Sequence, residues 1–92
     1  MTATKTAIVR VTGRVQGVWF RGWTRQQAQR LELGGWVRNE ADGSVTACLS
    51  GPAARVDEMV ARLHEGPRAA RVDAVAVQPS PAPQSQAFNI LR

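Results

Sequence analysis

The fold is decided by the stretch from residue 34 to residue 50, which reads GGWVRNEADGSVTACLS. Trp36–Glu40 and Ser44–Ser50 are short and strand-like, and Ala41-Asp42-Gly43 lies between them. An Asp-Gly pair between two such segments is a strong signal of a β-hairpin. The two glycines before Trp36 end a preceding helix. This stretch therefore predicts a hairpin that directly follows a helix.

Amphipathic helices are predicted on both sides of this hairpin. The segment Gly22–Leu33 is rich in good helix formers. One face of this helix carries Thr24, Ala28 and Leu31. After the hairpin, Gly51-Pro52 opens a second helix, because proline suits the first helical position. Apolar residues recur along it at helical spacing, at Val56, Met59, Val60 and Leu63, and Gly66-Pro67 ends it.

The outer segments supply the remaining strands. Ala7–Thr12 alternates between two faces with period two. Val72–Gln78 alternates in the same way except for its first valine, which suggests a β-bulge near Asp73. Pro79–Gln86 is rich in Pro, Ser and Gln and is expected to be an exposed connection. Ala87–Leu91 is expected to add a short terminal strand.

The order β-α-β-β-α-β predicts an α+β fold, a ferredoxin-like sandwich with two helices packed on one face of an antiparallel sheet. The 92 residues fit one domain, 1–92, in which residues 1–6 are expected to be a flexible N-terminus. With 43% apolar residues, the chain can bury a core without disulfide bonds or a structural metal ion. Its single cysteine, Cys48, has no partner for an intramolecular disulfide, and no apolar run is long enough for a signal peptide or a membrane span. We therefore expect a cytoplasmic protein.

The net charge of +5 is unevenly distributed along the chain. No carboxylate precedes Glu32, whereas the basic residues in that stretch are Lys5, Arg10, Arg14, Arg21, Arg25 and Arg30. One part of the molecule should therefore carry a positive field that attracts anions. A solubility feature of an arginine-rich proteome is the alternative explanation.

The loop Gly13–Arg21 joins the first strand to the N-terminus of the first helix. Unpaired N–H groups and the positive end of the helix dipole favour anions at such a junction, and glycines let successive N–H groups converge on one point. The spacing matches neither the P-loop nor the dinucleotide-binding motif. Taken alone, the loop is better explained as a structural turn.

Two motifs closely resemble the acylphosphatase family. The first is VTGRVQGVWFR at residues 11–21, and the second is GWVRN at residues 35–39, followed by Asp42-Gly43. The resemblance continues through Gly51, Gly66-Pro67, Ala70-Arg71-Val72 and Phe88-Asn89-Ile90, and so covers nearly the whole chain. It implies a metal-independent enzyme without a cofactor, whose partners are a small acyl phosphate and inorganic phosphate as product and competitive inhibitor. It implies no nucleic acid or membrane partner, and we expect a monomer.

By this resemblance, Arg21 and Asn39 are the catalytic pair. The phosphate-binding loop consists of Val15, Gln16, Gly17, Val18, Trp19 and Phe20. The residue types fit these roles, because a guanidinium can hold two phosphate oxygens at once and a side-chain amide can both donate to and accept from an attacking water. Neither motif contains His, Asp, Glu or Cys. The substrate must then have a leaving group that departs without protonation, such as the carboxylate of an acyl phosphate.

Other chemically capable residues are expected to be structural. They are His64 near the end of the second helix, Cys48 in a strand, Trp23 at the start of the first helix, and Trp36, which opens a strand. The carboxylates show no metal-ligand spacing. A nucleic-acid-binding module with the same topology is an alternative, but the two central strands lack aromatic residues for base stacking. A regulatory or carrier domain that holds phosphate without turnover is a second alternative.

Overall fold

The secondary structure follows the predicted order. The computed structural model describes residues 3–81 and 86–91. Its elements are β1 (Thr4–Arg14), α1 (Phe20–Arg30), β2 (Gly34–Asn39), β3 (Val45–Pro52), α2 (Ala53–Glu65), β4 (Arg71–Ser80) and β5 (Phe88–Leu91). The ferredoxin-like order and the short terminal strand are thereby confirmed. Among the described residues, no helix is both long and apolar enough to cross a membrane.

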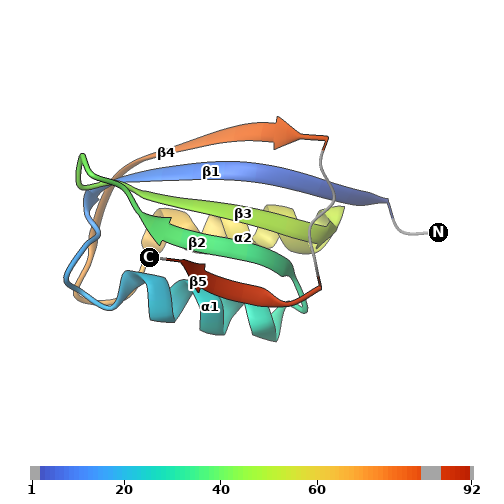
Figure 1. Cartoon of the computed structure of the whole chain (residues 1–92), viewed down its shortest axis with the longest axis horizontal. Coiled ribbons are helices and arrows are strands. Elements are labelled where there is room, and N and C mark those ends of the chain that lie inside the picture. The colour runs from blue at the N-terminus through green and yellow to red at the C-terminus, as the bar shows by residue number, and fades with distance from the viewer. Residues whose placement is uncertain (1–2, 82–85, 92) are drawn as a thin grey trace.

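The five strands form one sheet in the order β4-β1-β3-β2-β5 (Figure 1). The four strands predicted first pair antiparallel, as expected, whereas β5 pairs parallel with β2. The sheet is therefore mixed. The reason is geometric: β4 ends where β2 begins, so the returning chain enters the far edge of the sheet in the direction of β2.

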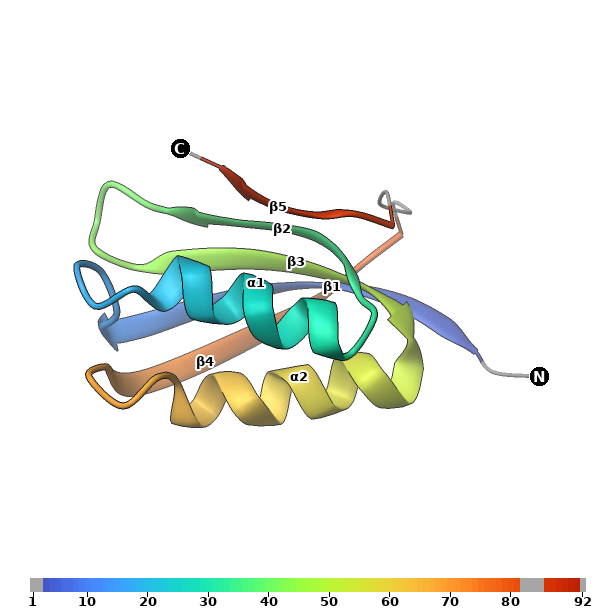
Figure 2. The same cartoon turned by 90° about the horizontal axis from the view of Figure 1, so that it is seen from below.

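Both helices lie on one face of the sheet, and the core fills the space between these two layers (Figure 2). Alternate residues of β1 and β3 point into this core, and the predicted apolar face of α2 meets them. The buried residues that these elements contribute to the core are Ala7, Val9, Val11, Val45, Ala47, Leu49, Val56, Met59 and Leu63. On α1, Thr24 and Ala28 are buried, as predicted, and Leu31 packs at the margin.

Several element boundaries differ from the prediction. β1 begins at Thr4, where it pairs with Pro52 of β3, so the N-terminus expected to be flexible includes residues of the sheet; residues 1 and 2 lie outside the described range. Pro52 is the last residue of β3, and α2 begins at Ala53. α1 begins at Phe20 and ends at Arg30, because Glu32 adopts a left-handed conformation with φ of 57° that a helix cannot contain.

The predicted bulge in β4 is confirmed. Thr12 pairs with Ala74 and Gly13 with Val72, so Asp73 is the extra residue. β4 continues to Ser80 and includes Pro79, which the prediction assigned to the connection. Proline is compatible with this position because β4 is an edge strand. Residues 82–85 of the expected connection lie outside the described residues.

Candidate active site

The β1–α1 loop and the end of β2 border one pocket. It has a volume of about 240 Å³. Its lining consists of Val15, Gln16, Gly17, Trp19, Phe20, Arg21, Gly22, Asn39 and Ile90. The structure thus brings together Arg21, Asn39 and all the predicted loop residues except Val18, whose side chain packs against the core.

The backbone of the loop presents unpaired N–H groups. Gly17 and Trp19 both adopt left-handed conformations, with φ of 74° and 62°. The first helical hydrogen bond runs from the N–H of Trp23 to the carbonyl of Trp19, at 3.0 Å. Within the described residues, the N–H groups of residues 17–22 donate no hydrogen bond, and the first turn of α1 has neither a side-chain cap nor an acidic residue. These N–H groups and the helix dipole favour an anion at this position.

Two predicted loop residues have side chains buried in the core. The side chains of Val15 and Phe20 are 1% and 2% exposed and belong to the hydrophobic core. The ring of Phe20 also packs against that of Trp23, with centroids 5.6 Å apart. Both side chains therefore anchor the ends of the loop, and only their backbone atoms can reach a ligand.

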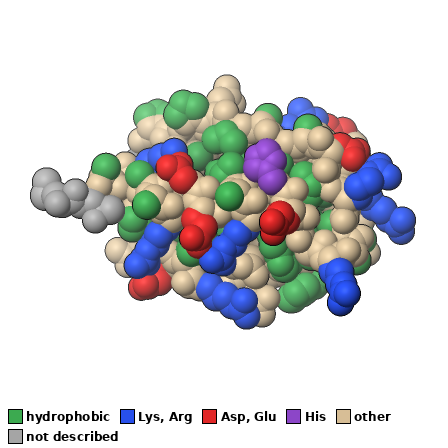
Figure 3. Space-filling model, turned by 180° about the vertical axis from the view of Figure 1, so that it is seen from behind, with side chains coloured by type: hydrophobic (Ala, Val, Ile, Leu, Met, Phe, Trp, Pro, Cys, Tyr) green, Lys and Arg blue, Asp and Glu red, His purple; other side chains and the backbone are tan. Residues whose placement is uncertain are grey.

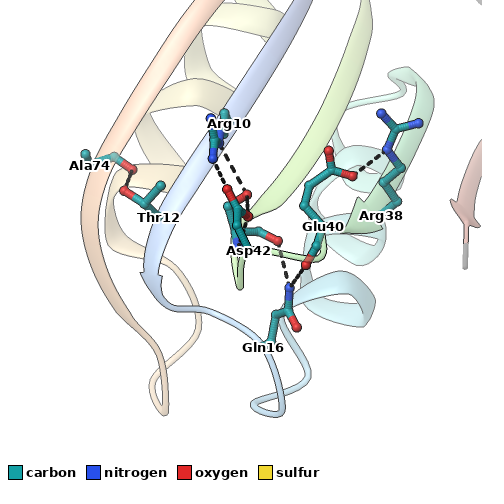
Figure 4. A network of polar contacts seen from close by, with 8 residues as sticks. Arg10, Thr12, Gln16, Arg38, Glu40, Asp42 and Ala74 are labelled. Atoms are coloured by element: carbon teal, nitrogen blue, oxygen red, sulfur yellow. Dashed lines mark hydrogen bonds and ion pairs between the residues drawn. The ribbon is translucent and has the colours of Figure 1, made fainter.

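Gln16 connects the loop to the turn between β2 and β3. Its side-chain Nε2 donates to the carbonyl oxygens of Glu40 and Ser44, each at 2.8 Å (Figure 4). Glu40 directly follows Asn39, and Ser44 lies at the other end of the same turn, so one amide connects the loop to the end of the strand that carries Asn39. The resemblance assigns Gln16 to phosphate binding. The structure instead occupies its side-chain nitrogen with backbone carbonyls.

A second set of contacts holds the same turn. Asp42 Oδ1 accepts hydrogen bonds from the backbone N–H and the hydroxyl of Ser44, at 2.9 and 2.6 Å, and Asp42 also pairs with Arg10. The hydrogen bonds from Ser44 lower the pKa of the Asp42 carboxyl, and the charge of Arg10 lowers it further. The turn after Asn39 is therefore fixed from both sides.

Arg21 and Asn39 keep most of their binding capacity for a ligand. Arg21 lies in the first turn of α1, and its Nη1 donates to the carbonyl oxygen of Leu91 at 3.1 Å. Asn39 is the last residue of β2, opposite Val45. Over residues 3–81 and 86–91, Arg21 has no carboxylate partner and the Asn39 amide has no hydrogen bond.

Comparison with known proteins shows the family of the chain. A model of the Acylphosphatase family matches residues 7–90. The chain belongs to the acylphosphatase family. The acylphosphatase of Rhizorhabdus wittichii is 55% identical over 81 residues, which are 88% of this chain and 82% of that protein. The acylphosphatase of Rhodospirillum rubrum is 51% identical over 92% of this chain and 93% of its own length.

A solved structure extends the comparison to three dimensions. The acylphosphatase from Coxiella burnetii superposes with a TM-score of 0.92 at 32% identity, covering 96% of this chain and 93% of that one. These comparisons confirm the family, the enzyme class and the fold that the two sequence motifs predict.

Ion pairs elsewhere leave the acylphosphatase pocket in a positive environment. Six ion pairs engage all the carboxylates except Glu65, namely Glu32, Glu40, Asp42, Asp57, Glu58 and Asp73. In the described part of the chain, no ion pair involves Arg14, Arg21, Arg25 or Arg30. The predicted positive region therefore lies along the loop and α1, where it attracts anions toward the pocket.

The residues expected to be structural lie outside the pocket. Cys48 is fully buried, and burial raises the pKa of its thiol, which keeps it protonated. His64 is exposed on α2, on the helix-covered side of the molecule (Figure 3). The guanidinium of Arg38 lies 4.8 Å from the ring centroid of Trp36. None of these contacts reaches Arg21 or Asn39.

Proposed function

We propose that this protein hydrolyses the carboxyl–phosphate bond of acyl phosphates, releasing a carboxylate and inorganic phosphate. The supporting observation is that one pocket is lined by Arg21, by Asn39 and by a loop whose N–H groups are unpaired within the described residues. Membership of the acylphosphatase family supports the same reaction.

Arg21 and the loop backbone hold the phosphoryl group in this proposal. The Arg21 guanidinium offers a planar fork of donors, and its bond to the carbonyl of Leu91 uses one nitrogen and limits the orientation of the rest. The N–H groups of residues 17–22 supply further donors along the loop. Because these donors are fixed before the substrate arrives, they stabilise the negative charge of the transition state with little reorganisation.

Asn39 orients the attacking water. Its amide oxygen can accept a hydrogen bond from the water, while its NH₂ group can donate to the water or to a phosphoryl oxygen. Correct placement of the nucleophile supplies much of the catalysis in phosphoryl transfer. The two sets of contacts at residues 40–44 hold the turn that follows Asn39 beside the loop.

The lining of the pocket restricts the leaving group. Among its described residues there is no His, Asp, Glu or Cys that could act as a general acid. A carboxylate, whose acid has a pKa of about 4, departs without protonation, whereas the alkoxide of a phosphate monoester does not. We therefore propose acyl phosphates, and not monoesters, as the substrate class. The proton of the water passes to an oxygen of the substrate phosphate.

We propose a cytoplasmic monomer that needs no metal ion, with inorganic phosphate as a competitive inhibitor. The guanidinium of Arg21 supports the metal-independent reaction, because it supplies positive charge where a metal ion would otherwise stand.

Release of phosphate from acetyl phosphate tests the proposal, and two variants test the roles. Arg21→Lys keeps the charge but loses the fork, so both turnover and inhibition by phosphate should weaken. Asn39→Ala should lower kcat by roughly 100-fold or more while KM changes little.

Thermal melts must first show that both variants fold. A folded Asn39→Ala protein with a sharply raised KM and normal kcat would make Asn39 a substrate ligand. A wild-type protein that binds phosphate but releases none from acetyl phosphate would be a carrier domain, and the proposed activity would be wrong.

A further inference from the structure

Trp19 has a position that folding alone does not explain. Its side chain is 65% exposed, the largest exposed fraction among the large hydrophobic residues described. Its backbone has φ of 62°, a left-handed conformation that is uncommon for a bulky residue. An exposed indole contributes little to the core, and such backbone strain persists chiefly where function requires it.

The indole of Trp19 lies against the backbone of α1 at Gly22. A Cβ atom at residue 22 would lie 2.1 Å from Nε1, 2.4 Å from Cε2 and 2.8 Å from Cδ1 of Trp19. Gly22 has no positive φ, so the helix itself does not require glycine at this place. Glycine is moreover a poor helix former. The missing side chain thus makes room for the indole against the helix.

A second hollow adjoins the pocket at Trp19. It has a volume of about 300 Å³. Its lining consists of Trp19, Gly22, Arg25, Gln26, Gln29 and Ile90. Trp19, Gly22 and Ile90 also line the pocket that contains Arg21 and Asn39. A phosphoryl group bound by Arg21 would therefore leave the rest of its substrate pointing past the indole and Ile90.

We propose that Trp19 and Ile90 bind the acyl part of the substrate and select a flat aromatic acyl group over a small aliphatic one. This inference rests on the acyl phosphate hydrolysis proposed above. The indole offers a flat apolar surface on which an aromatic ring stacks, and Ile90, 37% exposed, adds an apolar contact beside it. Trp19 is thus a specificity-determining residue, and Gly22 is a positioning residue that acts through the indole.

The test compares kcat/KM for benzoyl phosphate with kcat/KM for acetyl phosphate. For each variant, the ratio of the two is divided by the wild-type ratio, so that the different reactivities of the two anhydrides cancel. Trp19→Ala should lower this ratio roughly 3- to 10-fold, because one aromatic contact is lost. Alanine leaves a non-glycine residue at the left-handed position, so the backbone strain stays comparable.

Gly22→Ala provides an independent variant. The added methyl group displaces the indole without removing it, and the helix tolerates alanine well. This variant should also lower the ratio. Val77→Ala is the matched control, because Val77 is 48% exposed on β4, outside both hollows. It should leave the ratio unchanged.

A third substrate separates stacking from general apolar contact. Cyclohexanecarbonyl phosphate has a ring of similar size that is not flat. The wild type should prefer benzoyl phosphate to it, and Trp19→Ala should abolish the preference. An unchanged ratio in folded Trp19→Ala and Gly22→Ala proteins would overturn this inference alone. No phosphate release by the wild type from any of the three substrates would instead refute the proposed function.

Discussion

Replacing Gln16 by alanine tests whether its side chain holds the active site together. The change removes two hydrogen bonds of 2.8 Å, to the carbonyls of Glu40 and Ser44. Both carbonyls keep a backbone partner, since Glu40 accepts from Gly43 and Ser44 accepts from Glu40. Neither is left unsatisfied, so the cost is the net value of two hydrogen bonds, about 1–3 kcal/mol. In a domain of this size, Tm should fall by roughly 5–15 °C.

Gln16→Ala should also reduce activity by more than the loss of stability explains. Without the amide, the loop and the end of β2 can move relative to each other, and Asn39 no longer faces the bound phosphoryl group at a fixed distance. Because small misplacements of reacting groups are costly, kcat for acetyl phosphate should fall roughly 10-fold or more. The measurement is steady-state phosphate release at a temperature where melts show the variant fully folded.

Gln27→Ala is the matched control for this experiment. Gln27 Oε1 accepts a hydrogen bond of 2.7 Å from Arg62, between α1 and α2 and outside the pocket. Its loss should lower Tm while kcat stays normal. If Gln16→Ala lowers Tm but keeps the wild-type kcat, the connection is structural only, and the reasoning about Asn39 is wrong.

Gly35→Ala should destabilise the protein by about 3 kcal/mol or more in urea denaturation. The new Cβ would lie 1.9 Å from the carbonyl oxygen of Cys48, and residue 35 has a φ of 132°. A free energy of unfolding within about 1 kcal/mol of wild type would contradict this close approach of β2 and β3. For Asp42, hydrogen bonds from Ser44 and the charge of Arg10 lower the folded-state pKa below its ordinary value of 3.8. The resulting stabilisation is present above that value and is lost as pH falls through the folded pKa, so Tm of Asp42→Asn should converge with wild type at low pH. Tm curves that stay parallel down to low pH would oppose this. Finally, activity should persist in EDTA, and complete loss that magnesium restores would disprove a metal-independent reaction.

The helices and most strands were predictable because their signals are local. The apolar positions of α2 recur at helical spacing. Of the four residues that this spacing selects, Val56, Met59 and Leu63 are buried and Val60 is partly buried against the core. The Asp-Gly turn likewise lies within the hairpin it forms. The parallel pairing of β5 was not predictable in this way, because alternation indicates a strand but not its neighbour. That pairing depends on where β4 ends in space.

The candidate site likewise has parts that the sequence predicts and parts that only the fold reveals. The positions of Arg21 and Asn39 came from two motifs, and the structure places both on one pocket. The contacts of Gln16 could not be predicted, since its partners lie 24 and 28 residues away and a glutamine in a loop carries no local signal. The position of Trp19 depends on the missing side chain at Gly22, three residues later. Only the folded structure shows that the Trp19 indole lies against Gly22.

The hydrogen bond between Arg21 and Leu91 has a consequence for how activity arises during folding. It joins residues 70 apart along the chain, and β5 must dock on β2 before it can form. Contacts between distant residues form slowly, because closing the intervening loop costs entropy before any contact is gained. A chain with its helices and hairpin formed would still lack the acceptor that orients Arg21. Recovery of hydrolysis after dilution from denaturant should therefore coincide with docking of the last strand and lag behind the appearance of helical circular dichroism.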